Sequence, residues 1–372
     1  MKTRAAVLWD RNKEWSVEEI ELDPPKQGEV LVALGGSGLC HSDEHVVTGD
    51  LPTAVPIIGG HEGAGIVEEV GPGVIGLAPG DRVIFSFVPS CGQCRACAAG
   101  MGSICELGMY TREGRQISDH TARHHARGQD LGLMCLLGTF SHHTVVNEAS
   151  CIKIDDDIPL DRACLLGCGV VTGWGAAVNT AAVKAGQTVL VVGVGGIGIN
   201  AVQGARLAGA KNVIAIDPLE NKREKAMELG ATHSFASTDE AMETVTELTR
   251  GQMADAAILT PGLMTSEIVA GGFHAVGKGG VVVLTGLNKI MEQTIELPGT
   301  IMTLYRKSLK GSLFGDCNPT TDIPRILGLY QSGDIKLDEI ITRTYTLDQV
   351  NEGYDDLLSG KNVRGVVVHS HG

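Results

Sequence analysis

The chain has 372 residues, of which 43% are hydrophobic and 20% are charged, and its net charge is −14. This charge argues against nucleic acid or an anionic membrane as the main partner, because both are themselves negative. No apolar run approaches the roughly 18 residues of a membrane span, and the N-terminal stretch lacks the apolar centre of a signal peptide. The length predicts two domains, and we expect a cytoplasmic protein with a sizeable core.

The N-terminal part of the chain predicts a mostly antiparallel, barrel-like domain. Strand-like segments cover residues 29–34, 65–71 and 81–86, and glycine and proline separate them. The stretch 111–131 is polar and has no hydrophobic period, which predicts a long surface loop.

The central part of the chain alternates short apolar strands with helices. This alternation is typical of a doubly wound parallel sheet. The C-terminal tail again predicts helices and one strand. The predicted strands cover 188–193, 212–217, 255–260, 280–286 and 363–369. One predicted helix follows the first of these strands and ends near Leu207, and the others cover 220–229, 323–330 and 347–358.

A glycine-rich motif, GVGGIG at 193–198, follows the first central strand and opens a helix. Gly193 permits a tight turn, Gly195 lets the backbone approach a pyrophosphate, and Gly198 lets the helix pack on the strand. Asp217 follows about 20 residues later, which is the spacing of the acid that binds ribose hydroxyls. Its carboxylate would repel a 2′-phosphate, so the motif favours NAD over NADP. A glycine-rich turn that binds no nucleotide is the alternative.

Ten cysteines are present, and four of them, Cys91, Cys94, Cys97 and Cys105, fall within 15 residues. Four thiolates this close can surround one tetrahedral zinc ion and leave no position for a substrate, so the run predicts a structural zinc site. An iron–sulfur cluster is the alternative. The ferredoxin run has three residues before its fourth cysteine, whereas seven stand here.

A third constellation is scattered along the chain: Cys40 in GLCHSDEH, His61 with Glu62 in GGHEGAG, and Cys168 in GCGVVTGWG. One histidine and two cysteines form a known catalytic zinc set with a fourth position open to a substrate. Spacing alone cannot establish this set. Three other cysteines are equal candidates for the third ligand: Cys135, Cys151 and Cys164.

Read together, these motifs resemble the zinc-containing medium-chain alcohol dehydrogenase family in their order and approximate spacing, over essentially the whole chain. The resemblance implies oxidation of an alcohol to an aldehyde or ketone by hydride transfer to NAD, with two zinc ions per chain. It assigns the catalytic zinc to Cys40, His61 and Cys168, and it makes Glu62 a nearby or transient ligand. Ser42 and His45 would form the proton relay.

The resemblance also implies residues for the cofactor and the substrate. Thr172 would lie beside the nicotinamide, and His41 stands where many relatives carry an arginine near the pyrophosphate. An apolar pocket lined by Phe87, Tyr110, Leu136 and Leu137 predicts a medium-sized primary or allylic alcohol. The full set of cofactor residues implied is His41, Thr172, Gly193, Val194, Gly195, Gly196, Ile197, Gly198, Asp217, Lys222, Gly286 and Arg364.

The predicted fold class is α/β. A Rossmann-type NAD-binding domain at 170–312 is inserted into a GroES-like, mostly β catalytic domain formed by 1–169 and 313–372, with the active site in the cleft between them. The early part of 300–315 is predicted to be an apolar edge strand. Such edges tend to pair, and the resemblance adds pairing across a two-fold axis, so we expect a homodimer or a dimer of dimers.

The segment 120–146 resembles the actinobacterial nicotinoprotein branch of the family. Those enzymes hold NAD tightly and recycle it in place, with a nitrosoaniline dye or a dedicated redox partner as acceptor. Three alternatives stay open. They are an ordinary dehydrogenase with exchangeable NAD, a glutathione-dependent formaldehyde dehydrogenase, and a non-catalytic structural relative, which loss of a catalytic ligand would favour.

Overall fold

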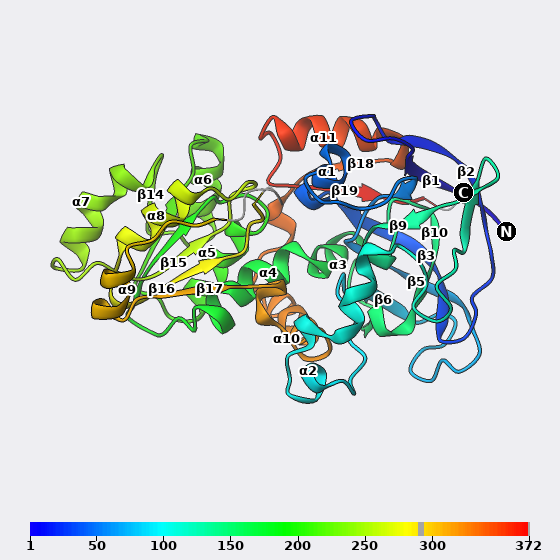
Figure 1. The fold of residues 1–372 in the computed structure, drawn as a ribbon, viewed down its shortest axis with the longest axis horizontal. Helices are drawn as coiled ribbons and strands as arrows, with labels where there is room; N and C mark the ends of the chain where they lie inside the picture. The colour runs from blue at the N-terminus through cyan, green and yellow to red at the C-terminus, as the bar shows by residue number, and fades with distance from the viewer. Residues whose placement is uncertain (289–293, 371–372) are drawn as a thin grey trace. The chain divides into compact units, whose positions relative to one another are not determined.

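A computed structural model describes residues 1–288 and 294–370 (Figure 1). The chain divides into two compact units. Unit 1 is Met1–Cys168 with Asn318–Tyr330 and Leu337–Gly372, and unit 2 is Gly169–Cys317 with Gln331–Lys336. Within the described ranges no single helix is long and apolar enough to cross a membrane. One bent pair of helices, Leu160–Gly167 and Gly169–Thr180, meets that test by length and composition alone, as buried core helices also do.

Unit 1 is built on two sheets whose strands pair mainly antiparallel. The strands are β1 (Lys2–Leu8), β2 (Ser16–Leu22), β3 (Glu29–Gly38), β4 (Ile57–Ile58), β5 (Gly63–Val70), β6 (Arg82–Phe85), β7 (His124–Ala126), β8 (Gln129–Asp130), β9 (Gly132–Leu133), β10 (His143–Asn147), β11 (Cys151–Ile154), β18 (Ile341–Tyr345) and β19 (Arg364–Val368). One sheet has the order β8-β7-β2-β1-β4-β9, and the other has the order β11-β6-β5-β3-β19-β18, with β10 also paired to β3. Only the β4–β9 and β18–β19 pairs among these described strands are parallel. The predicted barrel-like, mostly antiparallel fold is confirmed.

Short helices connect the strands of unit 1. They are α1 (His41–Thr48), α2 (Arg95–Ala98), α3 (Leu160–Ala163), α10 (Pro319–Gln331) and α11 (Val350–Leu358), with the 3₁₀ turns η1 (Gly102–Ile104), η2 (Glu106–Arg112), η3 (Met134–Leu136), η4 (Glu148–Ser150), η5 (Cys164–Gly167), η8 (Asp338–Ile340) and η9 (Leu347–Gln349).

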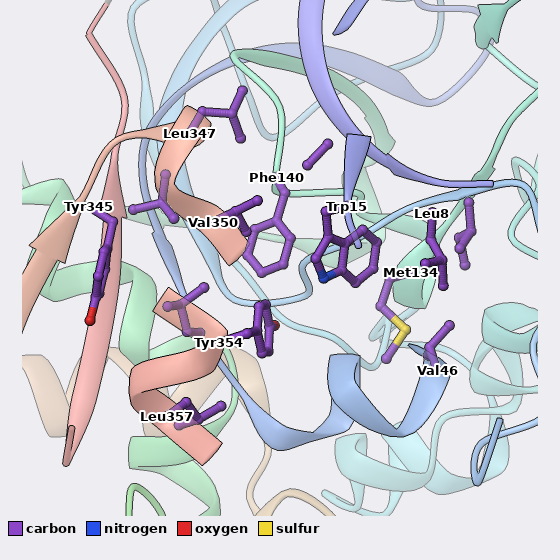
Figure 2. Close-up of a cluster of buried hydrophobic side chains, with 14 residues drawn as sticks. Leu8, Trp15, Val46, Met134, Phe140, Tyr345, Leu347, Val350, Tyr354 and Leu357 are labelled. Atoms are coloured by element: carbon purple, nitrogen blue, oxygen red, sulfur yellow. The ribbon is translucent and has the colours of Figure 1, made fainter. Parts of the chain in front are cut away.

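An aromatic core fixes α1 and α11 against the sheets of unit 1 (Figure 2). The ring centroids of Trp15 and Phe140 are 5.9 Å apart in an edge-to-face arrangement, and Tyr354 lies 6.1 Å from Phe140. Val46 of α1 joins the same core. The Tyr354 hydroxyl, at 3.4 Å, donates to the carbonyl of Cys40 at the start of α1. Because α1 carries Ser42 and His45, this core sets the position of a predicted site.

Unit 2 contains one six-stranded sheet, and all its strands are parallel. Its strands are β12 (Thr188–Val192), β13 (Asn212–Ile216), β14 (His233–Phe235), β15 (Ala254–Leu259), β16 (Val276–Leu284) and β17 (Ser308–Gly311). Its helices are α4 (Gly169–Gly175), α5 (Gly198–Leu207), α6 (Glu220–Glu228), α7 (Thr238–Leu248), α8 (Ser266–Ala275) and α9 (Gly299–Tyr305), with the π-helical turn η6 (Ala176–Thr180) and the 3₁₀ turn η7 (Phe314–Asp316).

The order of this sheet is β14-β13-β12-β15-β16-β17, so the chain leaves β12 in one direction and returns to its other side at β15. Ligands of open parallel sheets bind at such a switch point, outside the carboxyl ends of the strands. The predicted doubly wound sheet is therefore confirmed, and its switch point lies where β12 ends in the glycine-rich turn.

The prediction of an apolar edge strand in the early part of 300–315 is wrong. Residues Gly299–Tyr305 form the helix α9, and the edge strand is β17, which begins at Ser308. The apolar residues have a helical arrangement, because Ile301 and Met302 pack on the core of unit 2 while Leu304 is 70% exposed. A short apolar run of this kind is ambiguous between helix and strand in the sequence.

The prediction of one long surface loop at 111–131 is also wrong in part. The stretch contains β7 and β8, and β7 pairs with β2. The Arg123 guanidinium is fully buried and forms a bidentate pair with the buried Glu29 carboxylate at 2.6 and 2.8 Å. Two opposite charges that hydrogen-bond in this way can be buried together. Part of this polar stretch is therefore buried, although its sequence has no hydrophobic period that would predict burial.

Candidate functional site

The structure brings Cys40, His61, Glu62 and Cys168 together in unit 1, with one ligand atom from each lying within 4.8 Å of the others. All four side chains are buried. Cys40 follows β3 and stands at the start of α1, His61 and Glu62 precede β5, and Cys168 follows η5. Three distant segments thus meet in one place. None of the rival cysteines at 135, 151 and 164 belongs to this group of described residues.

Asp43 orients the histidine of this cluster, and sequence reasoning missed it. Its Oδ2 lies 2.9 Å from Nδ1 of His61, and its Oδ1 accepts a 2.8 Å hydrogen bond from the backbone N–H of Gly60. The Asp43 charge raises the pKa of His61 well above its usual value, against the opposing effect of burial. Both ring nitrogens of His61 are buried without a hydrogen-bond partner within the described residues, and the Asp43 ion pair lies on the Nδ1 side of the ring. A carboxylate on one ring nitrogen, with the other left for a metal, is the usual arrangement of a metal-binding histidine.

The two thiols of the cluster differ in their acidity. A hydrogen bond with Cys168, assisted by the charge of His61, holds the pKa of Cys40 well below its usual range. The same shared proton, together with burial, raises the pKa of Cys168. A thiolate is the form of cysteine that binds a metal. The donor set of two sulfurs and one imidazole nitrogen therefore fits a zinc ion.

Glu62 and Arg364 form a buried ion pair beside this cluster. Burial raises the pKa of Glu62 to about 7, although the charge of Arg364 opposes the shift. The pair joins the segment before β5 to the start of β19, 302 residues apart in the chain. The resemblance implies that Arg364 binds the cofactor, and the structure gives it a carboxylate partner within unit 1.

A second group of sulfurs lies in the lobe formed by α2, η1 and η2. Cys91, Cys94, Cys97 and Cys105 place their sulfur atoms within 4.8 Å of one another. The Cys94–Cys105 and Cys91–Cys97 sulfur pairs are 3.9 and 4.0 Å apart. Tetrahedral Zn–S bonds of about 2.3 Å require sulfurs about 3.8 Å apart. This set therefore also fits a zinc ion, and all four cysteines are free thiols.

Backbone N–H groups donate hydrogen bonds to these sulfurs and so favour the thiolate form, which is the form that binds a metal cation. The N–H of Cys94 donates to Cys91 Sγ at 3.3 Å, and the N–H of Cys97 donates to Cys94 Sγ at 3.5 Å. Hydrogen bonds from the N–H groups of Cys97 and Glu106 lower the pKa of Cys94 to about 6. Burial raises the pKa of Cys105 to about 12. A bound cation would favour the thiolate at every position of this set.

The glycine-rich turn of unit 2 has the close contacts that its sequence requires. Gly193 has a φ of +85°, and a Cβ there would lie 3.0 Å from the backbone of Pro261. A Cβ at Gly198 would lie 1.9 Å from the carbonyl oxygen of Gly193. Around Gly195, by contrast, a Cβ would meet only Lys222 Nζ, at 3.9 Å. The turn is thus tightly packed against the protein at Gly193 and Gly198, and it leaves space at Gly195.

Asp217 lies directly against this turn. Its Oδ2 accepts a 3.0 Å hydrogen bond from the N–H of Val194, and its Oδ1 accepts one of 3.0 Å from the N–H of Leu219. Thr172 lies on α4, and its Oγ1 is buried without a hydrogen-bond partner among the described residues. The next residue, Gly173, packs closely on the turn, because a Cβ there would lie 2.0 Å from the Ile197 carbonyl. A packed turn, an acid at its rim and an unused hydroxyl on the adjoining helix fit a dinucleotide. Gly286 follows β16, and a Cβ there would lie 2.7 Å from the Pro261 carbonyl.

The remaining predicted residues of unit 1 have separate environments. Ser42 Oγ lies 3.7 Å from Cys40 Sγ, and His45 Nδ1 lies 3.6 Å from Asp50 Oδ2, while His41 begins the same helix, α1. The Phe87 ring meets the His61 ring edge-to-face at 6.1 Å. The Tyr110 ring instead lies 5.3 Å from the His120 ring, with the two rings tilted by 55°. The adjacent Leu136 and Leu137 are buried, and Leu137 belongs to a core cluster of the barrel.

Comparison with known proteins gives the family. Residues 26–156 match the alcohol dehydrogenase GroES-like domain, and residues 196–332 match the zinc-binding dehydrogenase family. The chain is 54% identical over 370 residues to an NDMA-dependent alcohol dehydrogenase of Amycolatopsis methanolica, covering 100% of each chain. It is 51% identical to a putative alcohol dehydrogenase D of Mycobacterium tuberculosis, covering 99% of this chain and 100% of the relative.

Solved structures agree. An alcohol dehydrogenase zinc-binding domain protein from Burkholderia ambifaria has a TM-score of 0.93 at 32% identity, and benzyl alcohol dehydrogenase from Acinetobacter calcoaceticus has one of 0.89 at 27%, each with 100% of both chains covered. The chain belongs to the zinc-binding alcohol dehydrogenase family, and it is an enzyme that oxidises alcohols. Its likeness to an NDMA-dependent member is consistent with the predicted actinobacterial branch.

Proposed function

We propose that alcohol oxidation takes place at a zinc ion held by Cys40, His61 and Cys168, with NAD held on the turn at 193–198. The observation that carries this proposal is the buried, partnerless Nε2 of His61 within one cluster of soft donor atoms. When bound, zinc would polarise the alcohol oxygen and NAD would take the hydride.

The protein's own residues would then fix positions and move a proton. Asp43 holds the His61 ring in place from behind, and the buried pair of Glu62 and Arg364 keeps a carboxylate beside the metal ligands. Ser42 and His45 stand three residues apart on α1, so they lie on neighbouring positions of one helical face. This face would pass the alcohol's proton outward, from Ser42 toward His45.

We assign a second zinc ion to Cys91, Cys94, Cys97 and Cys105. The sulfur–sulfur distances of 3.9 and 4.0 Å and the N–H groups that donate to the sulfurs support this assignment. Four protein ligands leave no open position, so this ion would stabilise the lobe of α2, η1 and η2 and take no part in turnover.

The cofactor cycle is the finer part of the proposal. The 54% identity to an NDMA-dependent relative supports an enzyme that keeps NAD bound and passes its electrons to another acceptor. Tight retention means slow dissociation, because affinity differences among related complexes lie mostly in the off-rate. Asp217 at the rim of the turn supports NAD over NADP.

The test is to measure the nucleotide content of the purified enzyme before any cofactor is added. We expect about one NAD per chain, little gain in rate from added NAD, and sustained turnover of a short primary alcohol with a nitrosoaniline acceptor (NDMA). Protein that purifies without NAD, and that releases free NADH on each turnover, would contradict the retained cofactor. It would leave the zinc assignment standing.

We also propose a homodimer or a dimer of dimers in the cytoplasm. The edge strand β17 supports pairing, because it has a partner, β16, on one side only within the described sheet. Light scattering at micromolar concentration tests this proposal, and a monomer would contradict it.

A further inference from the structure

A cavity of about 820 Å³ opens in unit 2 at the end of the sheet where its strands begin, that is, at their N-terminal ends. Met253 immediately precedes β15, Val276 is the first residue of β16, and Lys307 immediately precedes β17, and all three residues line the cavity. Helix α9 contacts β16 (Figure 1). It supplies Ile301 and Tyr305 to the cavity lining. The glycine-rich turn follows the C-terminal end of β12, so it lies at the opposite end of the strands of this parallel sheet. The cavity is therefore separate from the proposed NAD site.

The lysines of this cavity have no acid beside them in its lining. Lys278 and Lys307 line it with the polar side chains of His274 and Gln252, and the lining contains no aspartate or glutamate. Neither lysine forms an ion pair within residues 1–288 and 294–370. Two lysines that share a cavity lining with no carboxylate are unexpected in a protein with a net charge of −14, where carboxylates outnumber cationic side chains.

Neutral groups hold both ammonium groups in place. Lys307 Nζ donates to the Phe273 carbonyl at 2.7 Å and lies 4.7 Å from the centroid of the Phe273 ring. Lys278 Nζ lies 5.1 Å from the centroid of the Tyr305 ring. Burial lowers the pKa of Lys307, because nearby charge does not compensate for the lost hydration of its ammonium group. An anion in the cavity would supply that compensation.

Much of the remaining wall is apolar, although Gln252 also lines the cavity. Met253, Val276, Pro298 and Ile301 contribute the apolar part, together with the Tyr305 ring. The volume lies in the range of roughly 300–1,000 Å³ that is typical of sites for organic ligands, and it greatly exceeds the space that an inorganic anion fills. A ligand matched to this wall carries an apolar body as well as a negative head group.

We propose that this cavity binds a small amphiphilic anion, a carboxylate with an aliphatic body. The head group pairs with Lys278 and Lys307, and the body lies against Met253, Val276 and Ile301. The site is independent of the zinc cluster and of the glycine-rich turn, so its occupancy does not depend on the proposed function.

Calorimetric titration of the full-length, zinc-loaded enzyme with octanoate tests this proposal. Wild-type protein should bind octanoate, and the double variant Lys278→Met, Lys307→Met should lose this binding or weaken it by about tenfold or more, because charge-assisted hydrogen bonds are lost. Methyl octanoate, which has the same body without the charge, should not compete with octanoate at this site. Added salt should weaken the wild-type affinity.

Lys211→Met is the matched control, because Lys211 is exposed and immediately precedes β13 at the same end of the sheet but does not line the cavity. It should bind octanoate as wild type does. The single variant Lys278→Met changes an exposed side chain and should weaken binding even if the double variant fails to fold. Octanoate binding that is absent from wild type, or that is equal in wild type and the lysine variants, would overturn the proposal.

Discussion

Asp43 Oδ2 lies 2.9 Å from His61 Nδ1, and both side chains are buried. The carboxylate also accepts the N–H of Gly60, so it links the start of α1 to the backbone beside the histidine. The contact leaves Nε2 of His61 as the ring nitrogen available to a metal. A residue that was missing from the predicted site therefore holds a predicted ligand in its orientation.

Asp43→Asn keeps the size of this side chain and removes its charge. We expect zinc to leave the His61 cluster roughly 10–100 times more readily and kcat to fall with it, because loss of a carboxylate behind a metal-binding histidine has effects of this size. Transfer of zinc to a chelator, followed by absorbance, measures the loss. Glu44→Gln, the next residue on α1, is the matched control and should release zinc as wild type does. Equal release from both variants would show that Asp43 does not position the ligand.

Cys94→Ser should reduce stability more than it reduces the activity per folded molecule. A structural zinc site contributes folding free energy, and a hydroxyl replaces its thiolate poorly. Thermal unfolding should show a clearly lower Tm, while the fraction that stays folded retains its kcat. Cys151→Ser, a cysteine outside both clusters, is the control and should change Tm little. If Cys94→Ser kept its Tm and lost only turnover, the roles of the two clusters would be exchanged.

Asp217→Gly combined with Pro218→Arg should move cofactor preference toward NADP. The acid accepts the N–H of Val194 at the rim of the turn, where its charge would oppose a 2′-phosphate and an arginine would attract one. The ratio of kcat/KM for NADP over NAD should rise by roughly tenfold or more after removal of a repulsive charge. The comparison uses enzyme stripped of its nucleotide. Glu220→Gln, an acid at the start of α6, is the control, and an unchanged ratio in the double variant would mean that Asp217 does not face the ribose.

His124 predicts a loss of stability in mild acid. It is fully buried in β7, where burial lowers its pKa from 6.5 to about 3. Its Nε2 lies 3.3 Å from Thr144 Oγ1, and its Nδ1 has no hydrogen-bond partner among the described residues, so the neutral ring is the buried form. Between the two pKa values the unfolded chain binds the extra proton. The free energy of unfolding therefore falls progressively as the pH drops from 6.5 to about 3, which are the pKa values of His124 in the unfolded and folded chain.

The variant His124→Gln removes this titration and keeps a hydrogen-bonding side chain of similar size. Between pH 7 and pH 5, wild type should lose about 2 kcal/mol of unfolding free energy that the variant does not lose. Denaturant unfolding at the two pH values measures the difference. His120→Gln, an exposed histidine paired with Glu113, should follow wild type. Parallel pH profiles for wild type and His124→Gln would contradict the buried neutral ring.

Sequence reasoning predicts most where a motif is local. The turn at 193–198 and the acid at Asp217 stand in one strand–turn–helix–strand unit, so their spacing carries their geometry. The cysteine run from Cys91 to Cys105 is local in the same way. The core that fixes α1 is different, because Trp15, Phe140 and Tyr354 come from three distant segments and have no common pattern in the sequence.

Contacts between distant residues could not be predicted from spacing. The pair of Glu62 and Arg364 joins residues 302 apart, and the buried Arg123 and Glu29 are 94 apart. In the sequence, three other cysteines are equal to Cys168 as candidates for the third ligand, and only the structure shows that Cys168 lies beside Cys40 and His61. The helix α9 was mistaken for a strand because its apolar run is too short to distinguish a period of two from one of 3.6. For Asp43 a local signal did exist, since an acid stands in the GLCHSDEH motif itself.

Zinc content measured together with turnover tests the central claim most directly. Elemental analysis of freshly purified wild type should give about two zinc ions per chain and essentially no iron, since two separate clusters of soft donor atoms are present. His61→Ala should retain about one zinc ion, keep its fold by circular dichroism and lose turnover, while His120→Ala, at an exposed position, should keep both ions and full activity. Wild type that is fully active with a single zinc ion, or His61→Ala that keeps both ions and its turnover, would contradict the account.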